Sequence, residues 1–149
     1  GLRVANVDFS PVAVETMRLA HPADSSYAAR QNEWFVADAL QMPFEDGVFD
    51  IVLDKGTFDA FEFAAFGRGA GGAAPAASAE PSGMARLCAE VDRVLRRDTS
   101  AVWLQVTHTD PELRLELLLD ALPAGPRAWS VGYRSLDGGE SSDGGGGFE

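Results

Sequence analysis

The stretch that most constrains this chain is Phe49–Thr57, with the sequence FDIVLDKGT. Its apolar residues stop abruptly at Asp54-Lys55-Gly56, and a short apolar run bounded by turn residues is typical of a parallel strand buried on both faces. In open α/β sheets, ligands bind just beyond the carboxyl ends of such strands. The pattern therefore places Asp54 and Lys55 where chemistry is usually found. Lys55 is also the only lysine of the chain, beside eleven arginines.

Length and composition limit the classes of function. The 149 residues suffice for one domain with its own core. A formal net charge of -11 argues against nucleic acid as a partner, because phosphate contacts need a basic surface, and it leaves small molecules and basic proteins open. No apolar run approaches the ~20 residues of a membrane span, so no membrane partner is expected. Cys88 is the only cysteine, which excludes a disulfide framework and a Cys-x-x-Cys site, and no metal is expected.

The order of patterns along the chain predicts an α/β fold. Strands are expected at 2–8, 33–37, 49–54, 101–107 and 127–134, and helices at 11–20, 56–66, 83–97 and 111–122. Two segments without periodicity, the Gly/Ala/Pro-rich 67–82 and the Gly/Ser-rich 135–147, are expected to be flexible. Because strands alternate with helices, we expect one domain over 1–149, with a mostly parallel sheet and helices on both faces.

The helix expected at 83–97 carries a single apolar stripe at helical spacing. The stripe consists of Met84, Leu87, Cys88, Val91, Val94 and Leu95. Cys88 is therefore interpreted as a small core residue rather than a nucleophile. Phenylalanines of the preceding helix, Phe58 among them, are likewise expected in the core.

Three of the expected strands end in an aspartate, namely Asp8, Asp38 and Asp54. At one edge of a parallel sheet, these carboxylates would line a common crevice. An acidic residue in such a place can bond the ribose of a nucleotide, although Asp8 can also be an ordinary loop aspartate. His108 follows the strand expected at 101–107 and lies near the same crevice, where it can contact a substrate or be a loop histidine.

Three strings of residues resemble the class I S-adenosylmethionine-dependent methyltransferases. They are VDFSPVAV at 7–14, ADA at 37–39 and PFEDGVFDIVLDKGTFDA at 43–60. Within that class, the Leu-Asp-Lys-Gly-Thr-x-Asp-Ala string is similar to the eukaryotic methyltransferase-like group, which includes the lysine methyltransferases of elongation factor 1-alpha and of citrate synthase. The DFSPVAV string and DPELRL at 110–115 resemble the citrate synthase enzyme more. The resemblance implies a Rossmann-like, doubly wound sheet.

The resemblance also implies roles for individual residues. Asp8, with Phe9 beside it, would bind the ribose of S-adenosylmethionine, and Asp38 would accept from the adenine amino group next to the Ala39 backbone. Asp54 and Lys55 would be the catalytic residues, near the methionine end of the cofactor. The residues expected to shape the substrate channel are Phe58, Asp59 and His108.

The chain also departs from the family pattern. The family's first strand, with its Gly-x-Gly-x-Gly loop under the cofactor, has no counterpart, and neither has the last strand. Residues 97–100 replace the usual Pro-Gly-Gly. We therefore interpret the chain as a fragment whose sheet lacks the first and last strands. Its N-terminus is expected to be missing, so the presence of a targeting peptide cannot be read from the sequence. A cytoplasmic and a mitochondrial location therefore both stay open.

The reaction that the resemblance implies is methyl transfer from S-adenosylmethionine to a lysine of a protein substrate. No Asn/Asp-Pro-Pro-Tyr string follows Asp54, which disfavours the enzymes that methylate adenine or glutamine amino groups. A small-molecule methyltransferase is the first alternative. A catalytically inactive interaction module is the second, because the glycine-rich loop is missing. A nicotinamide-binding Rossmann domain would leave the Leu-Asp-Lys-Gly-Thr string unexplained.

Overall fold

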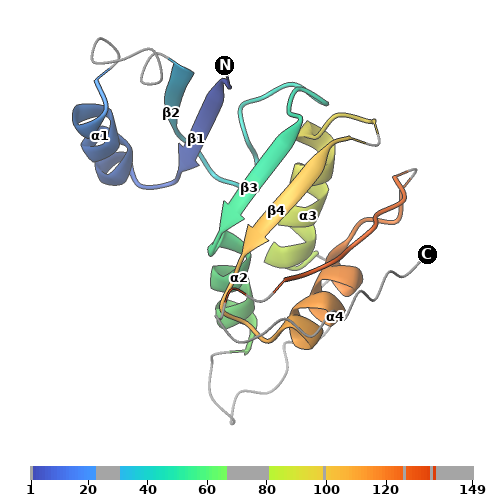
Figure 1. Ribbon diagram of the computed structural model, residues 1–149. Helices are drawn as coiled ribbons and strands as arrows, with labels where there is room; N and C mark the ends of the chain where they lie inside the picture. Colours follow the sequence, from blue (N-terminus) through green and yellow to red (C-terminus); the bar gives the residue numbers. More distant parts are fainter. Residues whose placement is uncertain are drawn as a thin grey trace.

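A computed structural model describes residues 2–22, 31–66, 81–98, 100–125, 127–134 and 136, with the side chains of 65 and 66 left aside. Its elements follow one another along the chain in Figure 1. They are β1 (Val4–Asp8), α1 (Pro11–Ala20), β2 (Asn32–Val36), β3 (Ile51–Lys55), α2 (Thr57–Phe66), α3 (Gly83–Val94), β4 (Val102–Val106) and α4 (Pro111–Ala121). None of the described helices is long and apolar enough to cross a membrane.

The strands form two separate parallel pairs, β1–β2 and β3–β4. The predicted parallel pairing is thus confirmed, but no ladder among the described residues joins the pairs into one sheet. The arrows of β1, β3 and β4 point the same way in Figure 1, so their carboxyl ends face one side of the molecule. We call the carboxyl ends of β3 and β4, with the loops that follow them, the carboxyl edge.

The connection between β2 and β3 ties the two pairs together. The ring of Phe44 meets those of Phe35 and Phe49 edge to face, with ring centroids 5.2 Å apart for Phe35 and 4.9 Å apart for Phe49. From α3, Arg93 donates to the carbonyl oxygen of Phe44 at 2.7 Å, and Glu90 accepts from the backbone N–H of Met42 at 2.6 Å. The hydrogen bond from the Arg93 guanidinium is the main cause that lowers the pKa of the Glu90 carboxyl. These contacts hold the connection against α3 and between the two strand pairs.

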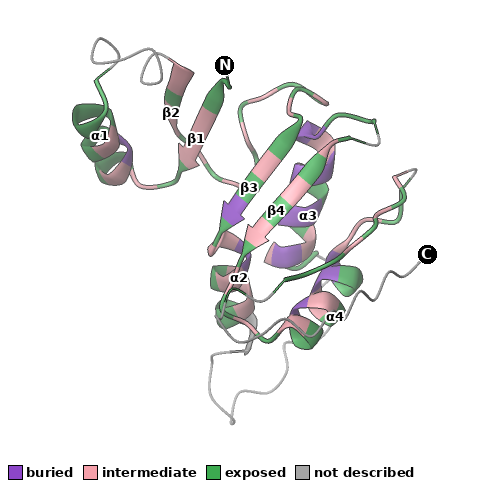
Figure 2. Cartoon of the chain, in the orientation of Figure 1, coloured by how far each residue is buried: buried purple, intermediate pink, exposed green. Residues whose placement is uncertain are grey.

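The core lies between α3 and one face of the β3–β4 pair, and residues of α2 and α4 complete it. Every residue of the predicted stripe on α3 and its C-cap is buried: Met84, Leu87, Cys88, Val91, Val94 and Leu95. Figure 2 shows this burial concentrated on α3, whereas α1 is mostly exposed. Phe58 from α2 and Leu118 from α4 complete the cluster. The predicted core positions of Cys88 and Phe58 are confirmed.

The prediction that β3 is buried on both faces is wrong for the described structure. Ile51 is 53% and Leu53 66% exposed, whereas Val52 and Asp54 point towards the helices. Val102, Leu104 and Val106 of β4 are exposed as well. Side chains alternate between the faces of a strand, so only one face of this pair contacts a described helix.

The strand predicted at 127–134 is also not formed. Residues 127–134 have no regular secondary structure, because no described strand lies beside them to share a hydrogen-bond ladder. Trp129 and Val131 nevertheless pack against the core at alternate positions, as a strand would. Arg127 fixes the segment by donating to Asp92 at 2.6 Å. The flexible segments predicted at 67–82 and 135–147 lie almost wholly outside the described residues.

The burial of Cys88 yields a test of this core. Desolvation, with a smaller contribution from the charge of Asp54, raises the pKa of the Cys88 thiol from 9.0 to about 12. Because the thiolate is the reactive form, wild-type protein at pH 8 should resist Ellman's reagent until it is unfolded in urea. The stability that this thiol contributes should be complete below pH 9 and be lost as the pH rises towards 12.

An exposed cysteine provides the matched control for this measurement. Leu119 is exposed on α4, so a Leu119→Cys variant should react at once in the folded state at its added thiol. Rapid labelling of the wild type without denaturant would contradict the placement of Cys88 in the core.

Candidate functional site

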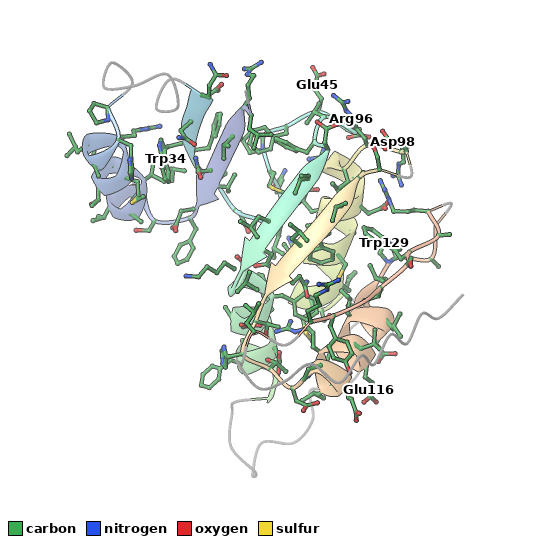
Figure 3. All side chains as sticks on the ribbon, viewed as in Figure 1. Trp34, Glu45, Arg96, Asp98, Glu116 and Trp129 are labelled. Carbon is green, nitrogen blue, oxygen red and sulfur yellow. The ribbon has the colours of Figure 1, made fainter. Side chains whose placement is uncertain are left out.

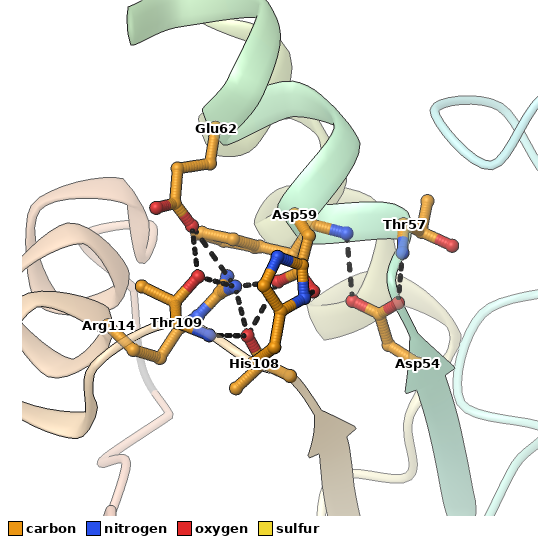
Figure 4. A network of polar contacts seen from close by, with 9 residues as sticks. Asp54, Thr57, Asp59, Glu62, His108, Thr109 and Arg114 are labelled. Atoms are coloured by element: carbon orange, nitrogen blue, oxygen red, sulfur yellow. Dashed lines mark hydrogen bonds and ion pairs between the residues drawn. The ribbon is translucent and has the colours of Figure 1, made fainter. Parts of the chain in front are cut away.

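Asp54 joins the end of β3 to the start of α2. It is 7% exposed, and its carboxylate accepts the backbone N–H groups of Thr57 at 2.8 Å and Phe58 at 3.2 Å. These are N–H groups that a helix leaves unpaired at its start. Gly56 supplies the sharp turn with a φ of 85°, which residues with a Cβ rarely adopt. The Asp-Lys-Gly-Thr string is thus a strand-to-helix junction that folds around one carboxylate (Figure 4).

Lys55 has a different environment from Asp54. Adjacent residues of a strand point to opposite faces, so the side chain of Lys55 lies on the exposed face with Leu53. No hydrogen bond or ion pair of Lys55 occurs within the described part of the chain. Its ammonium is therefore available at the carboxyl edge.

A buried arginine joins three elements beside this junction. Arg114 of α4 is 6% exposed, and its Nη2 contacts the carboxylate of Asp59 and lies 3.1 Å from that of Glu62, both on α2. The same nitrogen donates to the hydroxyl oxygens of Thr107 at 2.7 Å and Thr109 at 3.3 Å, which follow β4. The two hydroxyls in turn donate to the two carboxylates, so these side chains form one connected network, drawn in Figure 4.

The guanidinium of Arg114 also lies over the ring of Phe58, 4.5 Å from its centroid. Burial lowers the pKa of Arg114, and the charge of Asp54 opposes that shift. Arginine keeps its proton in proteins, so the network holds one fixed positive charge against two carboxylates. Phe58 itself is buried beneath this charge, and its predicted place in a substrate channel stays a prediction.

His108 lies at the outer end of the network. Its Nδ1 is 3.3 Å from Oδ2 of Asp59, while its side chain is 91% exposed. The structure therefore brings together five of the predicted site residues at or beside the carboxyl edge, namely Asp54, Lys55, Phe58, Asp59 and His108.

The other predicted residues lie at the carboxyl end of the β1–β2 pair. Asp8 accepts the N–H of Ser10 at 2.7 Å, and Asp38 accepts that of Leu40 at 2.9 Å, in each case through Oδ1. The backbone N–H of Ala37 donates to the carbonyl oxygen of Asp8 at 3.1 Å, so both aspartates lie at the same end of the strand pair, with Asp38 two residues beyond the register partner of Asp8. Both are exposed, as is Phe9, whereas Ala39 packs against the core.

Other features of the described surface are remote from these residues. A shallow hollow beside α1 is lined by Arg18, His21, Asn32, Glu33, Trp34 and Phe35. Figure 3 labels Arg96 and Asp98 near the amino ends of β3 and β4, opposite the carboxyl edge. No group of three or more His, Cys, Asp or Glu side chains in the described ranges is placed to hold a metal ion.

Sequence reasoning missed the arginine network. The sequence patterns do not predict these residues at the site: Arg114, Glu62, Thr107 and Thr109. One local signal was available for Arg114, because residues 114, 118 and 121 share one face of a helix, and Leu118 and Ala121 on that face are buried. An arginine in the apolar stripe of a helix needs a buried partner.

Comparisons with known proteins identify the family of the chain. A family model described as a methyltransferase domain matches residues 1–103. EEF1A lysine methyltransferase 4 of Mus musculus is 39% identical over 57 residues, which cover 38% of this chain and 20% of that protein. The crystal structure of the [4+2]-cyclase SpnF superposes with a TM-score of 0.50 and 15% identity, over 80% of this chain and 42% of that one, and supports the fold alone. The chain thus spans about a fifth of the curated relative and under half of the solved one.

The buried network makes a prediction about stability. Replacing Arg114 by alanine would leave two largely buried carboxylates, those of Asp59 and Glu62, without their cation. Breaking a buried ion pair from one side costs about 3–5 kcal/mol of the free energy of unfolding, measurable by urea denaturation. Arg86→Ala, at an exposed position of α3, is the control and should change stability by no more than ~0.5 kcal/mol. Equal stability of the two variants would contradict the role given to Arg114.

Proposed function

The chain belongs to the methyltransferase domain family, and we propose that it forms part of an enzyme that transfers a methyl group from S-adenosylmethionine to a lysine of a protein. The observation that carries the proposal is the position of Asp8, Asp38 and Asp54. Asp8 is the last residue of β1, Asp38 follows β2 by two residues, and Asp54 is the penultimate residue of β3, all within residues 1–103, which the family model matches. Ligands of open α/β sheets bind at such strand ends.

The free oxygen atoms of Asp8 and Asp38 fit the proposed cofactor. Each carboxylate uses Oδ1 for a local turn, and its Oδ2 has no hydrogen-bond partner among the described residues. A carboxylate with a free oxygen can accept the hydroxyl groups of a ribose or the amino group of an adenine. We propose that Asp8 and Phe9 hold the ribose and that Asp38, with the Ala39 backbone, holds the adenine.

The proposed chemistry needs mainly positioning from the protein. The sulfonium of S-adenosylmethionine supplies an already activated methyl group, so the enzyme has to align the acceptor and exclude water. Asp54 uses both carboxylate oxygens to cap α2, and we propose that it fixes the geometry of the acceptor site. Lys55, Asp59 and His108 are then the polar groups nearest an incoming substrate.

A protein lysine is the acceptor class that we favour. The net charge of -11 suits a basic protein surface better than an anionic substrate. The name of the mouse relative, which concerns lysine methylation, supports the same class for the matched 57 residues. A lysine must be neutral to attack, and desolvation of its amine lowers its pKa and favours that form.

We further propose that another strand lies between β1 and β3. The family resemblance implies a strand there that ends in the glycine-rich loop. The lack of any ladder between the two strand pairs among the described residues, and the exposed apolar side chains of Ile51 and Leu53, support this proposal. A parallel sheet normally has both faces covered, which this pair lacks in the described residues.

Binding of S-adenosylhomocysteine tests the proposed function. Isothermal titration would compare this chain with a version extended by the family's first strand and its helix. We expect the extended version to bind and this chain to bind far more weakly, because the glycine-rich loop would contact the cofactor directly. Failure of both versions to bind would contradict the proposal and would favour the inactive interaction module.

Substitution of Asp8 tests the proposed ribose contact in the extended version. A lost hydrogen bond to a charged acceptor costs about 1.5–3 kcal/mol, so Asp8→Ala should raise the Kd for S-adenosylhomocysteine ~10-fold or more. Asp50→Ala is the matched control, since Asp50 is also exposed but precedes β3 at its amino end and pairs with Arg96. Equal affinities of the two variants would contradict the ribose role of Asp8.

A further inference from the structure

We propose that His108, oriented by Asp59, accepts the proton that a lysine ammonium must lose before it can be methylated. This inference rests on the proposed function and assigns a role at the same site. It requires a basic atom near the acceptor, a partner that holds this atom in place, and an outlet for the proton.

The Asp59–His108 pair supplies a basic atom and a carboxylate close enough to orient it. Oδ1 of Asp59 is engaged by Arg114 and by the hydroxyl of Thr107, whereas Oδ2 faces Nδ1 of His108 at 3.3 Å (Figure 4). A neutral imidazole that donates its Nδ1–H to a carboxylate keeps Nε2 free as a base. Asp59 is largely buried and held by its other partners, so it can set the orientation of the imidazole.

His108 also lies on the correct side of the sheet. Lys55, the last residue of β3, pairs in register with Val106, the last residue of β4. His108 follows two residues later, so its imidazole and the Asp54-Lys55 dipeptide occupy the same edge. A substrate that approaches this edge meets both.

The other polar groups of the carboxyl edge are less suited to take the proton. Both oxygens of Asp54 accept N–H groups of α2, and Asp59 and Glu62 are bound to Arg114. Lys55 is itself a cation. Among the described residues of this edge, His108 is the group that combines a free basic nitrogen with full exposure.

The charges around His108 can accommodate a second positive charge. Asp59 and Glu62 on α2 carry two negative charges, and Arg114 on α4 balances one of them. Asp110, which caps α4, adds a further carboxylate two residues along the chain. An imidazolium at position 108 would therefore face three carboxylates against two cations, the guanidinium of Arg114 and the ammonium of Lys55.

Nε2 of His108 takes a proton from the lysine ammonium, which leaves a neutral amine and an imidazolium. The nitrogen lone pair then forms the new N–C bond while the C–S bond breaks, and its electron pair stays on sulfur as a neutral thioether. Because the imidazole is 91% exposed, the imidazolium can release its proton to water.

Nuclear magnetic resonance can test the pair without any methyl transfer. The chain has only two histidines, His21 and His108, so their ring nitrogens are readily assigned. We expect neutral His108 to carry its proton on Nδ1, and we expect Asp59→Asn to shift it towards Nε2. An Nε2–H tautomer of His108 in the wild type would overturn the proposal.

Kinetics of the extended enzyme, with a lysine-containing protein substrate, test the role in proton transfer. General-base catalysis is worth ~10²–10⁴-fold, so His108→Gln should lower kcat by about 10²-fold with little change in KM. The deficit should shrink at high pH, where the free lysine loses its proton without help. His21→Gln is the matched control, because His21 ends α1 beside Trp34, away from this edge, and it should retain the wild-type rate.

Two outcomes separate this inference from the proposed function. If the wild type binds S-adenosylhomocysteine and transfers methyl groups, and His108→Gln has the same rate and pH profile, only the role of His108 is overturned. If the wild type neither binds nor transfers, both proposals fall together.

Discussion

The guanidinium of Arg114 is the interaction on which the carboxyl edge depends. Burying a cation is costly, and here the cost is offset by Asp59, Glu62 and the hydroxyls of Thr107 and Thr109. These partners belong to α2 and to the loop after β4, so the charge holds three elements in one arrangement. Because Arg114 occupies one oxygen of Asp59, only the other oxygen faces His108. The network therefore decides which polar atoms remain available to a ligand.

A second constraint is the unequal covering of the β3–β4 pair. One face contacts α3 over a closely packed stripe, and the other exposes Ile51, Leu53 and three residues of β4. Exposed apolar side chains in such number on one face indicate an interaction surface in a stable protein. The further strand proposed between β1 and β3 would account both for this face and for the separation of the two strand pairs among the described residues.

Sequence patterns predicted those features that depend on neighbouring residues. The helices expected at 11–20 and 111–122 are formed as α1 and α4, and the predicted stripe on α3 is buried throughout. Asp8 and Asp54 lie at the ends of their strands, as the apolar runs indicated. An apolar run does not reveal whether one or both faces of a strand are covered, which explains the error at β3. Alternation at 127–134 does not reveal whether a partner strand exists. The Arg114 network joins residues far apart in the sequence, and no local pattern encodes such pairs.

The Asp-Lys-Gly-Thr string shows how structural and chemical roles can be separated. Asp54 is needed to cap α2, Gly56 to make a turn with positive φ, and Thr57 to offer the first N–H of the helix. These three residues are explained by folding alone, so their presence is weak support for a catalytic function. Lys55 is the exception, because its side chain makes no contact that the described structure requires. A residue that the fold does not explain, at the strand end where ligands bind, is the strongest single pointer to chemistry in this string. The same reasoning separates Asp8 and Asp38, each with a free carboxylate oxygen, from the fully engaged Asp54.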